Sequence, residues 1–293
     1  MSADSTSKYP EDLRTLVVAA LDRLGFSVIP ATAGLEEAMR YSLLAGGKRV
    51  RPVLALATAR ALGADPELFL PVAAAIELIH TYSLIHDDLP AMDDDELRRG
   101  LPTSHVKYGE DVAILAGDGL FAEAVRLFCT QPGDPALVLA ALQELAGATG
   151  VDGMVGGQYV DVIGREGDAD SLRALHALKT GRLIAASVGV ILVLEGLERS
   201  ETMAYRQFAG ELGVLFQIVD DILDVTESDE QLGKPQGSDE RHGKLTYVSL
   251  FGLDRARDLA AESYEKATAA LAEANGDTDD LMRVADYIFT RNE

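Results

Sequence analysis

The sequence predicts an all-α protein built as a single large helical bundle. Apolar residues recur at helical spacing through most of the 293 residues, and strand-like alternation is nearly absent. The hydrophobic fraction of 47% is enough for one sizeable core. No composition shift or Ser/Pro-rich linker divides the chain, so residues 1–293 are expected to form one domain.

Each expected helix is a segment rich in Ala, Leu, Glu and Arg at helical spacing, and glycine or proline breakers fall between the segments. Gly46-Gly47 precedes the second segment, Gly63 separates the second from the third, and Pro132-Gly133 precedes the fifth. In chain order the segments are 13–24, 50–62, 66–86, 110–128, 135–148, 172–197, 202–225 and 264–274. An acidic cluster lies at the carboxyl end of the third and of the seventh segment, and we expect these two helices to face each other across a central cavity.

The charge balance limits the partners. Asp plus Glu number 48 against 26 Lys plus Arg, and the net charge of -22 would repel nucleic acid, so an anionic substrate would need cations as intermediaries. The single cysteine, Cys129, excludes an internal disulfide and suits a reducing compartment. The amino terminus lacks a secretory pattern, and the longest uncharged run, 183–194, is too short to span a bilayer. We therefore expect a cytoplasmic protein without stable membrane insertion.

The first acidic cluster lies in HTYSLIHDDLPAMDDDELRRG, residues 80–100. Asp87 and Asp88 are six and five residues before Asp93, so an uninterrupted helix would not align them. Pro90 is predicted to break or bulge the helix and to turn Asp93 back toward Asp87.

The second cluster lies in QIVDDILDV, residues 217–225. Asp220 and Asp224 are four residues apart and share one helix face, with Asp221 beside them. Carboxylate oxygens without thiolates suit Mg²⁺ or Mn²⁺, and Mg²⁺ usually binds through a few carboxylates, waters and substrate phosphates. The two clusters together predict a metal-assisted diphosphate site.

Three other interpretations of the acidic clusters compete with a diphosphate site. In a chain this acidic, either cluster alone would be a solvated helix end, but two clusters, each closing an apolar helix and each followed by basic residues, favour a functional site. The adjacent His86-Asp87 pair suggests an HD-type metallophosphohydrolase, which needs further helix-spaced histidines that the sequence lacks. A di-iron bundle would need a second pair like Glu77-x-x-His80, and there is none.

The chain resembles the bacterial short-chain trans-isoprenyl diphosphate synthases, the farnesyl/geranylgeranyl diphosphate synthase family, over nearly its whole length. The matching stretches fall in the family's order, and together they are highly specific. They are GGKRVRP (46–52), IHTYSLIHDDLPAMDDDELRRGLPTSH (79–105), ILAGDGL (114–120), MVGGQ (154–158), KTG (179–181), FQIVDDILD (216–224), LGKPQGSD (232–239) and GKLTY (243–247). The resemblance implies the family's isoprenoid synthase type of helical bundle.

The resemblance also implies a reaction. An allylic diphosphate ionises, the double bond of isopentenyl diphosphate attacks the carbocation, and loss of a proton leaves a chain five carbons longer. Mg²⁺ ions, three as in the family and replaceable by Mn²⁺, are expected to offset the leaving-group charge. The expected ligands are Asp87, Asp93, Asp220 and Asp224, whereas Asp88 and Asp221 would contribute through water or by orienting their neighbours.

Basic residues take their expected roles from the same resemblance, because guanidinium forks suit phosphate oxygens. Lys48, Arg51, His80 and Arg99 are matched to the isopentenyl diphosphate, and Arg98 to the allylic diphosphate. Lys179, Thr180 and Gln217 are matched to positions near the ionising carbon. Lys234 and Lys244 lie in glycine-bearing loops expected to close over the diphosphates and to exclude water.

Tyr82 is expected to limit the product length. It lies five residues before Asp87, about 7 Å down a helix from the metal-binding end. Ser83 lies more squarely on the face of Asp87 and is small, whereas the Tyr82 ring would have to reach round. With the Leu89-Pro90 insertion, this pattern resembles farnesyl (C15) diphosphate synthases, although the floor of the cavity could instead come from another helix or a partner subunit.

Alternatives within and near the family stay open. Geranyl (C10) and geranylgeranyl (C20) products are possible, as is a regulatory subunit of a heteromeric synthase, although such subunits usually lack one acid cluster. Class I terpene cyclases pair their acid site with an Asn/Ser/Glu-type second site, whereas the second site here is Asp220, Asp221 and Asp224. A homodimer formed through an apolar helical face is expected.

Overall fold

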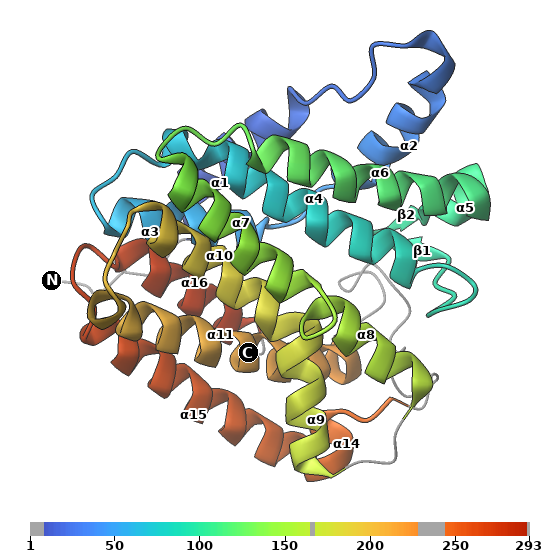
Figure 1. Ribbon diagram of the computed structural model, residues 1–293. Coiled ribbons are helices and arrows are strands. Elements are labelled where there is room, and N and C mark those ends of the chain that lie inside the picture. The colour runs from blue at the N-terminus through green and yellow to red at the C-terminus, as the bar shows by residue number, and fades with distance from the viewer. Residues whose placement is uncertain (1–8, 165–167, 228–243, 292–293) are drawn as a thin grey trace, which may run out of the picture.

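Helices form most of the computed structural model, which describes residues 9–164, 168–227 and 244–291. Figure 1 shows them packed side by side as a bundle. The helices are α1 (Glu11–Asp22), α2 (Ala33–Leu43), α3 (Val50–Ala61), α4 (Leu70–Asp87), α5 (Ser104–Tyr108), α6 (Glu110–Phe128), α7 (Pro135–Thr149), α8 (Met154–Ile163), α9 (Ala169–His176), α10 (Arg182–Leu194), α11 (Arg199–Thr226), α14 (Tyr247–Phe251), α15 (Leu253–Ala272) and α16 (Asp279–Thr290). Short 3₁₀ turns lie at η1 (Pro30–Thr32) and η2 (Pro66–Phe69), and β1 (Leu97–Arg98) pairs antiparallel with β2 (Leu101–Pro102).

Two central helices carry the core. α4 and α10 are buried over most of their length, from Val72 to Ile85 and from Leu183 to Leu192. A helix that is apolar on all faces must be surrounded by other helices. α6 packs along α4, and α3, α7 and α11 pack against α10 (Figure 1). The all-α prediction is confirmed, and the buried apolar side chains form one cluster.

The predicted helix 172–197 is interrupted. α9 ends at His176, a π-helical turn, η3 (Ala177–Gly181), follows, and α10 continues from Arg182. Gly157 of α8 lies against this turn, where a Cβ atom would come within 2.3 Å of the Lys179 backbone nitrogen. π-Turns inside helices often mark functional sites, and this one carries Lys179 and Thr180.

Several elements were not predicted from the sequence, namely α2, α5, α8, α14, α16, the first half of α15 and the two-residue strands. α8 reads MVGGQYVDVI, and its two glycines and β-branched residues have low helix propensity. Its helix is stabilised by packing against η3 and α7, contacts that the residues of α8 alone do not indicate.

Two stretches, Pro66–Asp87 and Ala169–Leu194, have the length and hydropathy of membrane-spanning helices. In the most apolar window of each, 67% and 50% of the residues are buried inside the protein. Core helices of soluble proteins pass the same test, so the finding is weak evidence for a membrane span.

Candidate active site

The two acid-bearing helices α4 and α11 border a cavity of about 640 Å³, together with α8 and η3. Most of the residues singled out in the sequence line it: Arg51, His80, Tyr82, Ser83, Asp87, Asp93, Arg98, Arg99, Lys179, Thr180, Gln217, Asp220, Asp221 and Lys244. Lys48, Asp88 and Asp224 are not in its wall. Lys234 and the stretch 232–239 lie outside the described residues.

The chain reverses direction directly after α4. The Asp93 amide donates a hydrogen bond of 2.8 Å to the Asp87 carbonyl, and the Asp94 amide donates one of 3.1 Å to the Leu89 carbonyl. Asp94 adopts a left-handed conformation with φ of 52°, which Asp tolerates better than most residues. α4 ends at Asp87 and the chain turns Asp93 back toward it, as Pro90 predicted.

The electrostatics of the first cluster favour a cation. Burial raises the pKa of Asp87 to about 6, and the Asp93 charge adds to the rise, although Lys179 opposes it. The Lys244 ammonium lies 3.0 Å from both carboxylate oxygens of Asp93. This corner of the cavity therefore concentrates negative charge that a bound cation stabilises.

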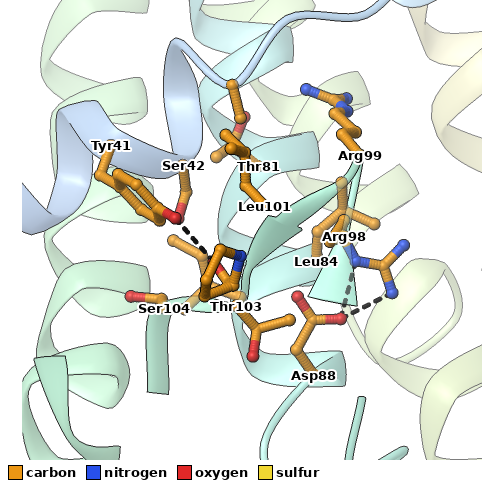
Figure 2. Close-up of a pocket in the computed structure, with 13 residues that line it drawn as sticks. Tyr41, Ser42, Thr81, Leu84, Asp88, Arg98, Arg99, Leu101, Thr103 and Ser104 are labelled. Atoms are coloured by element: carbon orange, nitrogen blue, oxygen red, sulfur yellow. Dashed lines mark hydrogen bonds and ion pairs between the residues drawn. The ribbon is translucent and has the colours of Figure 1, made fainter. Parts of the chain in front are cut away.

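Asp88 does not line this cavity, and its carboxylate pairs with Arg98, as Figure 2 shows. Its Oδ1 lies 2.7 Å from Arg98 Nε and 2.6 Å from Nη2, and its side chain is buried. Burial raises the pKa of Asp88 to about 6, and the guanidinium partly offsets that rise. The second acid of this pair is therefore placed to orient Arg98 at the cavity wall.

Asp221 likewise holds neighbouring groups by hydrogen bonds. Its carboxylate accepts hydrogen bonds from Gln217 Nε2 at 2.8 Å and from the Tyr247 amide at 2.7 Å. Gln217 Oε1 in turn accepts from the Thr180 hydroxyl at 3.0 Å. This chain of bonds fixes the amide of Gln217 and the hydroxyl of Thr180 at the cavity.

The structure separates Asp220 from Asp224. Asp220 is exposed on the cavity wall, whereas Asp224, one turn further along α11, is 2% exposed and does not line the cavity. The shared helix face predicted for the two residues therefore places only Asp220 in contact with the cavity.

Three of the four groups matched to isopentenyl diphosphate come together. Arg51 Nη1 lies 3.4 Å from His80 Nε2, and Arg99 lines the same wall. Burial, and then the Arg51 charge, lower the pKa of His80 well below its usual range, so the imidazole is neutral at pH 7. Lys48 is not brought to this group, because its ammonium lies 3.0 Å from Glu11 and close to the Tyr9 and Tyr287 rings.

Contacts around the cavity wall hold the loop that precedes Arg51 and the hairpin that carries Arg99. Arg49, between Lys48 and Arg51 in sequence, is buried and pairs at 2.5 Å with buried Glu77 of α4. The Arg99 guanidinium donates to the Gly46 carbonyl, which ties the β1–β2 hairpin to the same loop. These contacts hold the glycine loop against α4 and the hairpin.

Tyr82 reaches the cavity wall below Asp87. Its ring makes edge-on contacts with Phe121 of α6, 5.3 Å between centroids, and with His86, 5.8 Å. Ser83 donates its hydroxyl to the His80 carbonyl at 2.9 Å and presents a small side chain to the cavity. Phe121, which was not singled out in the sequence, therefore lies directly behind the Tyr82 ring.

Asp161 of α8 is a further cavity residue that the sequence analysis missed. Its Oδ2 accepts a hydrogen bond of 2.5 Å from Lys179 and lies 3.6 Å from the Lys244 ammonium. The only sequence sign was an acid in the apolar segment that follows MVGGQ. Its partners lie 18 and 83 residues away, so no local pattern reveals them.

The donor set fits hard divalent cations such as Mg²⁺. Asp87, Asp93 and Asp220 offer carboxylate oxygens to one cavity, and Asp93 already pairs with the Lys244 ammonium there. Among the described residues, no three Asp, Glu, His or Cys side chains lie close enough to enclose an ion by themselves. Such a site needs waters or substrate phosphates to complete the coordination, which is usual for Mg²⁺.

Comparisons with known proteins now identify the family. The polyprenyl synthetase family model matches residues 32–287. The chain belongs to the polyprenyl synthetase family. It is 43% identical to a farnesyl diphosphate synthase from Geobacillus stearothermophilus over the full length of both chains. It is 46% identical to a chloroplastic geranylgeranyl pyrophosphate synthase from Capsicum annuum, over 88% of this chain and 72% of the relative.

Solved structures agree with this assignment. The polyprenyl synthetase superposes on a geranyltransferase from Helicobacter pylori complexed with magnesium and isoprenyl diphosphate, with a TM-score of 0.83, 31% identity and coverage of 100% of this chain and 97% of the other. An FPP/GFPP synthase from Zymomonas mobilis gives a TM-score of 0.81 with 36% identity and 95% coverage of both chains. The protein is therefore a prenyltransferase of the trans-isoprenyl diphosphate synthase type.

Proposed function

We propose that this polyprenyl synthetase condenses isopentenyl diphosphate with dimethylallyl and then geranyl diphosphate, and that farnesyl diphosphate (C15) is its main product. The observation that carries the product length is the Tyr82 ring, which stands in the cavity wall below Asp87 with Phe121 behind it. The full-length likeness to the Geobacillus farnesyl diphosphate synthase supports the same product.

The cationic side chains form two groups, one for each substrate diphosphate. Arg51, neutral His80 and Arg99 form one group, which suits the isopentenyl diphosphate, and Lys48 joins it by turning from Glu11. Arg98, held by Asp88, and Lys179 and Lys244, held by Asp161, face the acid clusters and suit the allylic diphosphate. Lys234 is assigned to the same group by resemblance alone.

Asp87, Asp93, Asp220 and Asp224 are the proposed Mg²⁺ ligands. The magnesium-bound Helicobacter relative supports Mg²⁺ use, and we propose three ions per site, with Mn²⁺ able to substitute. When bound, these ions supply positive charge that stabilises the departing diphosphate. Asp224 would join the set by turning from its buried position in α11.

The polar groups beside the cavity stabilise a carbocation without reacting with it. The Thr180 hydroxyl donates to Gln217, so its oxygen lone pairs are free to face positive charge in the cavity. Asp221 fixes the Gln217 amide so that its oxygen, rather than its nitrogen, faces Thr180. The apolar Tyr82 and Phe216 walls exclude water, which would otherwise capture the cation.

A C20 product is the second candidate, because the Capsicum geranylgeranyl pyrophosphate synthase is also a close relative at 46% identity. The two products differ in one elongation step and in the depth of cavity that the tail needs. The position of the floor at Tyr82 favours the shorter product.

The test is product length by mass spectrometry. Purified protein is incubated with isopentenyl diphosphate and separately with dimethylallyl, geranyl or farnesyl diphosphate, with Mg²⁺ or with chelator. Mg²⁺-dependent C15 from the two shorter starters, with little use of farnesyl diphosphate, is the expected result. A C20 product would replace the C15 assignment, a C10 product would move the floor closer to Asp87, and no product would favour a regulatory subunit.

The proposed setting is a cytoplasmic homodimer without nucleic-acid partners or stable membrane insertion. The net charge of -22 opposes nucleic-acid binding. Exposed apolar side chains on α6, including Ile114, Leu115, Phe121 and Val125, offer a face for a second copy.

A further inference from the structure

Asp161 stands between two lysines of the cavity wall. Its carboxylate is within 2.5 Å of the Lys179 ammonium and 3.6 Å of the Lys244 ammonium, and its side chain is nearly buried. Burial acts to raise the pKa of Asp161, but Lys179 and then Lys244 outweigh it, so the pKa lies below its usual range. Asp161 is therefore ionised and serves as a fixed counter-charge for both lysines.

Lys244 is shared between Asp161 and Asp93. Its ammonium contacts both oxygens of Asp93 at 3.0 Å, so it uses lone pairs on each of them. A divalent cation binds a carboxylate oxygen at roughly 2.0–2.1 Å and repels an ammonium at the same group. For a cation to bind Asp93, Lys244 must move away from it.

The charges around Lys244 favour a negative partner for it. Asp93, Asp161, Lys179 and Lys244 together carry no net charge, nearby Asp87 adds one negative charge, and a divalent cation at Asp93 leaves this group with one positive charge. Asp161 already lies 3.6 Å from the Lys244 ammonium in the cavity wall and remains a negative partner for it. Diphosphate oxygens entering beside the cation then offer Lys244 a stronger partner.

We propose that Asp161 is a positioning residue that retains Lys244 when a divalent cation displaces it from Asp93, so that metal binding and diphosphate binding are coupled through this lysine. The proposal rests on the proposed metal role of Asp93. It implies that Lys244 competes with the metal before substrate binds and helps to bind the diphosphate afterwards.

The test measures Mn²⁺ binding to the full-length protein, by the electron paramagnetic resonance signal of free Mn²⁺, with and without inorganic diphosphate. Lys244→Gln is expected to tighten Mn²⁺ binding without diphosphate by roughly fivefold, a typical coupling between sites. In the same variant, diphosphate should enhance Mn²⁺ binding less than in the wild type. Asp161→Asn is expected to weaken Mn²⁺ binding, because Lys244 then stays on Asp93.

Matched controls isolate the effect. Lys266→Gln and Asp170→Asn make the same charge changes at exposed positions and should leave Mn²⁺ binding unchanged. In an Asp93→Asn background, Lys244→Gln should no longer tighten binding. Opposite shifts exclude loss of structure, which would weaken binding in both cavity variants. The Asp93→Asn background distinguishes competition from the change of charge alone, because the charge change would still tighten Mn²⁺ binding there.

Two results would overturn the proposal. One is unchanged or weaker Mn²⁺ binding in Lys244→Gln, and the other is a shift of both cavity variants in the same direction. If Asp93→Asn weakens Mn²⁺ binding while Lys244→Gln does nothing, only the coupling is wrong. If Asp93→Asn itself has no effect, the metal role of Asp93 fails and the coupling fails with it.

Discussion

Asp87 illustrates, at the scale of one residue, how a poorly solvated carboxylate in the cavity wall reduces stability. Its pKa rises from an ordinary 3.8 to about 6 on folding, mainly through burial. Because the folded state holds the proton more tightly, Asp87 stabilises the protein fully below pH 4, and this contribution is lost as pH rises through 6. At neutral pH the metal-free protein therefore retains an ionised carboxylate in an unfavourable place.

Asp87→Asn should stabilise the metal-free protein at pH 7. Two pKa units correspond to roughly 3 kcal/mol, and solvent screening at this part-buried position reduces the gain to about 1–2 kcal/mol. The gain should vanish at pH 4, where wild-type Asp87 is protonated. Thermal denaturation in chelator at both pH values measures it, and an equal effect at the two would rule out the titration of Asp87 as its source.

Asp88→Asn tests whether the second acid of the first pair orients Arg98 or binds metal. Loss of the charged partner should release Arg98 and raise KM for the allylic diphosphate by about tenfold, with a smaller change in kcat. Asp95→Asn is the matched control, because Asp95 lies further from Arg98 at 3.4 Å and should matter less. Weaker Mn²⁺ binding with unchanged KM would instead make Asp88 a metal ligand.

At the scale of elements, the contact between α4 and α6 supports the proposed floor of the cavity. The Tyr82 ring leans on Phe121, so Phe121→Ala should let the ring swing outward and add C20 to the products. Tyr82→Ala should lengthen the product more, and adding Phe121→Ala to it should change little further, since the two residues act as one unit. Mass spectrometry of the prenyl chains measures the distribution.

Val125→Ala is the control for the floor, because it shortens an exposed apolar side chain one turn further along the same helix. It should leave the C15 product unchanged. If Phe121→Ala and Val125→Ala lengthen the product equally, the outer face of α6 acts in some other way than through the Tyr82 ring.

The contact between α8 and η3 depends on a glycine. A Cβ atom at Gly157 would meet the Lys179 backbone nitrogen at 2.3 Å, so Gly157→Ala should displace the π-turn and destabilise the protein by about 1–3 kcal/mol. Gly147→Ala in α7 is the matched change, because its Cβ would meet nothing within 4 Å and should stabilise by about 0.5–1 kcal/mol. Urea denaturation distinguishes the two, and equal effects would deny the close approach.

At the scale of the whole molecule, the sequence predicted what is local and missed what is long-range. Helical periodicity and the spacing of the acids depend on residues within a few turns of one another, so the helical fold and the Asp93 turn were predicted correctly. The outward turn of Lys48 depends on Glu11, and the role of Asp161 depends on Lys244, contacts between distant segments. The π-turn at Lys179 packs against α8, and the periodic pattern of apolar residues in the sequence does not indicate it.

Assembly into a homodimer is a prediction for the whole molecule. α6 exposes Ile114, Leu115, Phe121 and Val125, an apolar face beside the helix that carries the proposed floor residue Tyr82. If a second copy covers this face, Leu115→Glu places a charge in the interface and should give a protein of half the wild-type mass in sedimentation experiments. Leu139→Glu on α7 makes the same change at an exposed apolar position outside that face and should leave the mass unchanged. If the Leu115→Glu variant retains the wild-type mass, the interface lies elsewhere. If the variant is a monomer and makes a longer product, the partner subunit supports the Phe121 side chain in the wild-type protein.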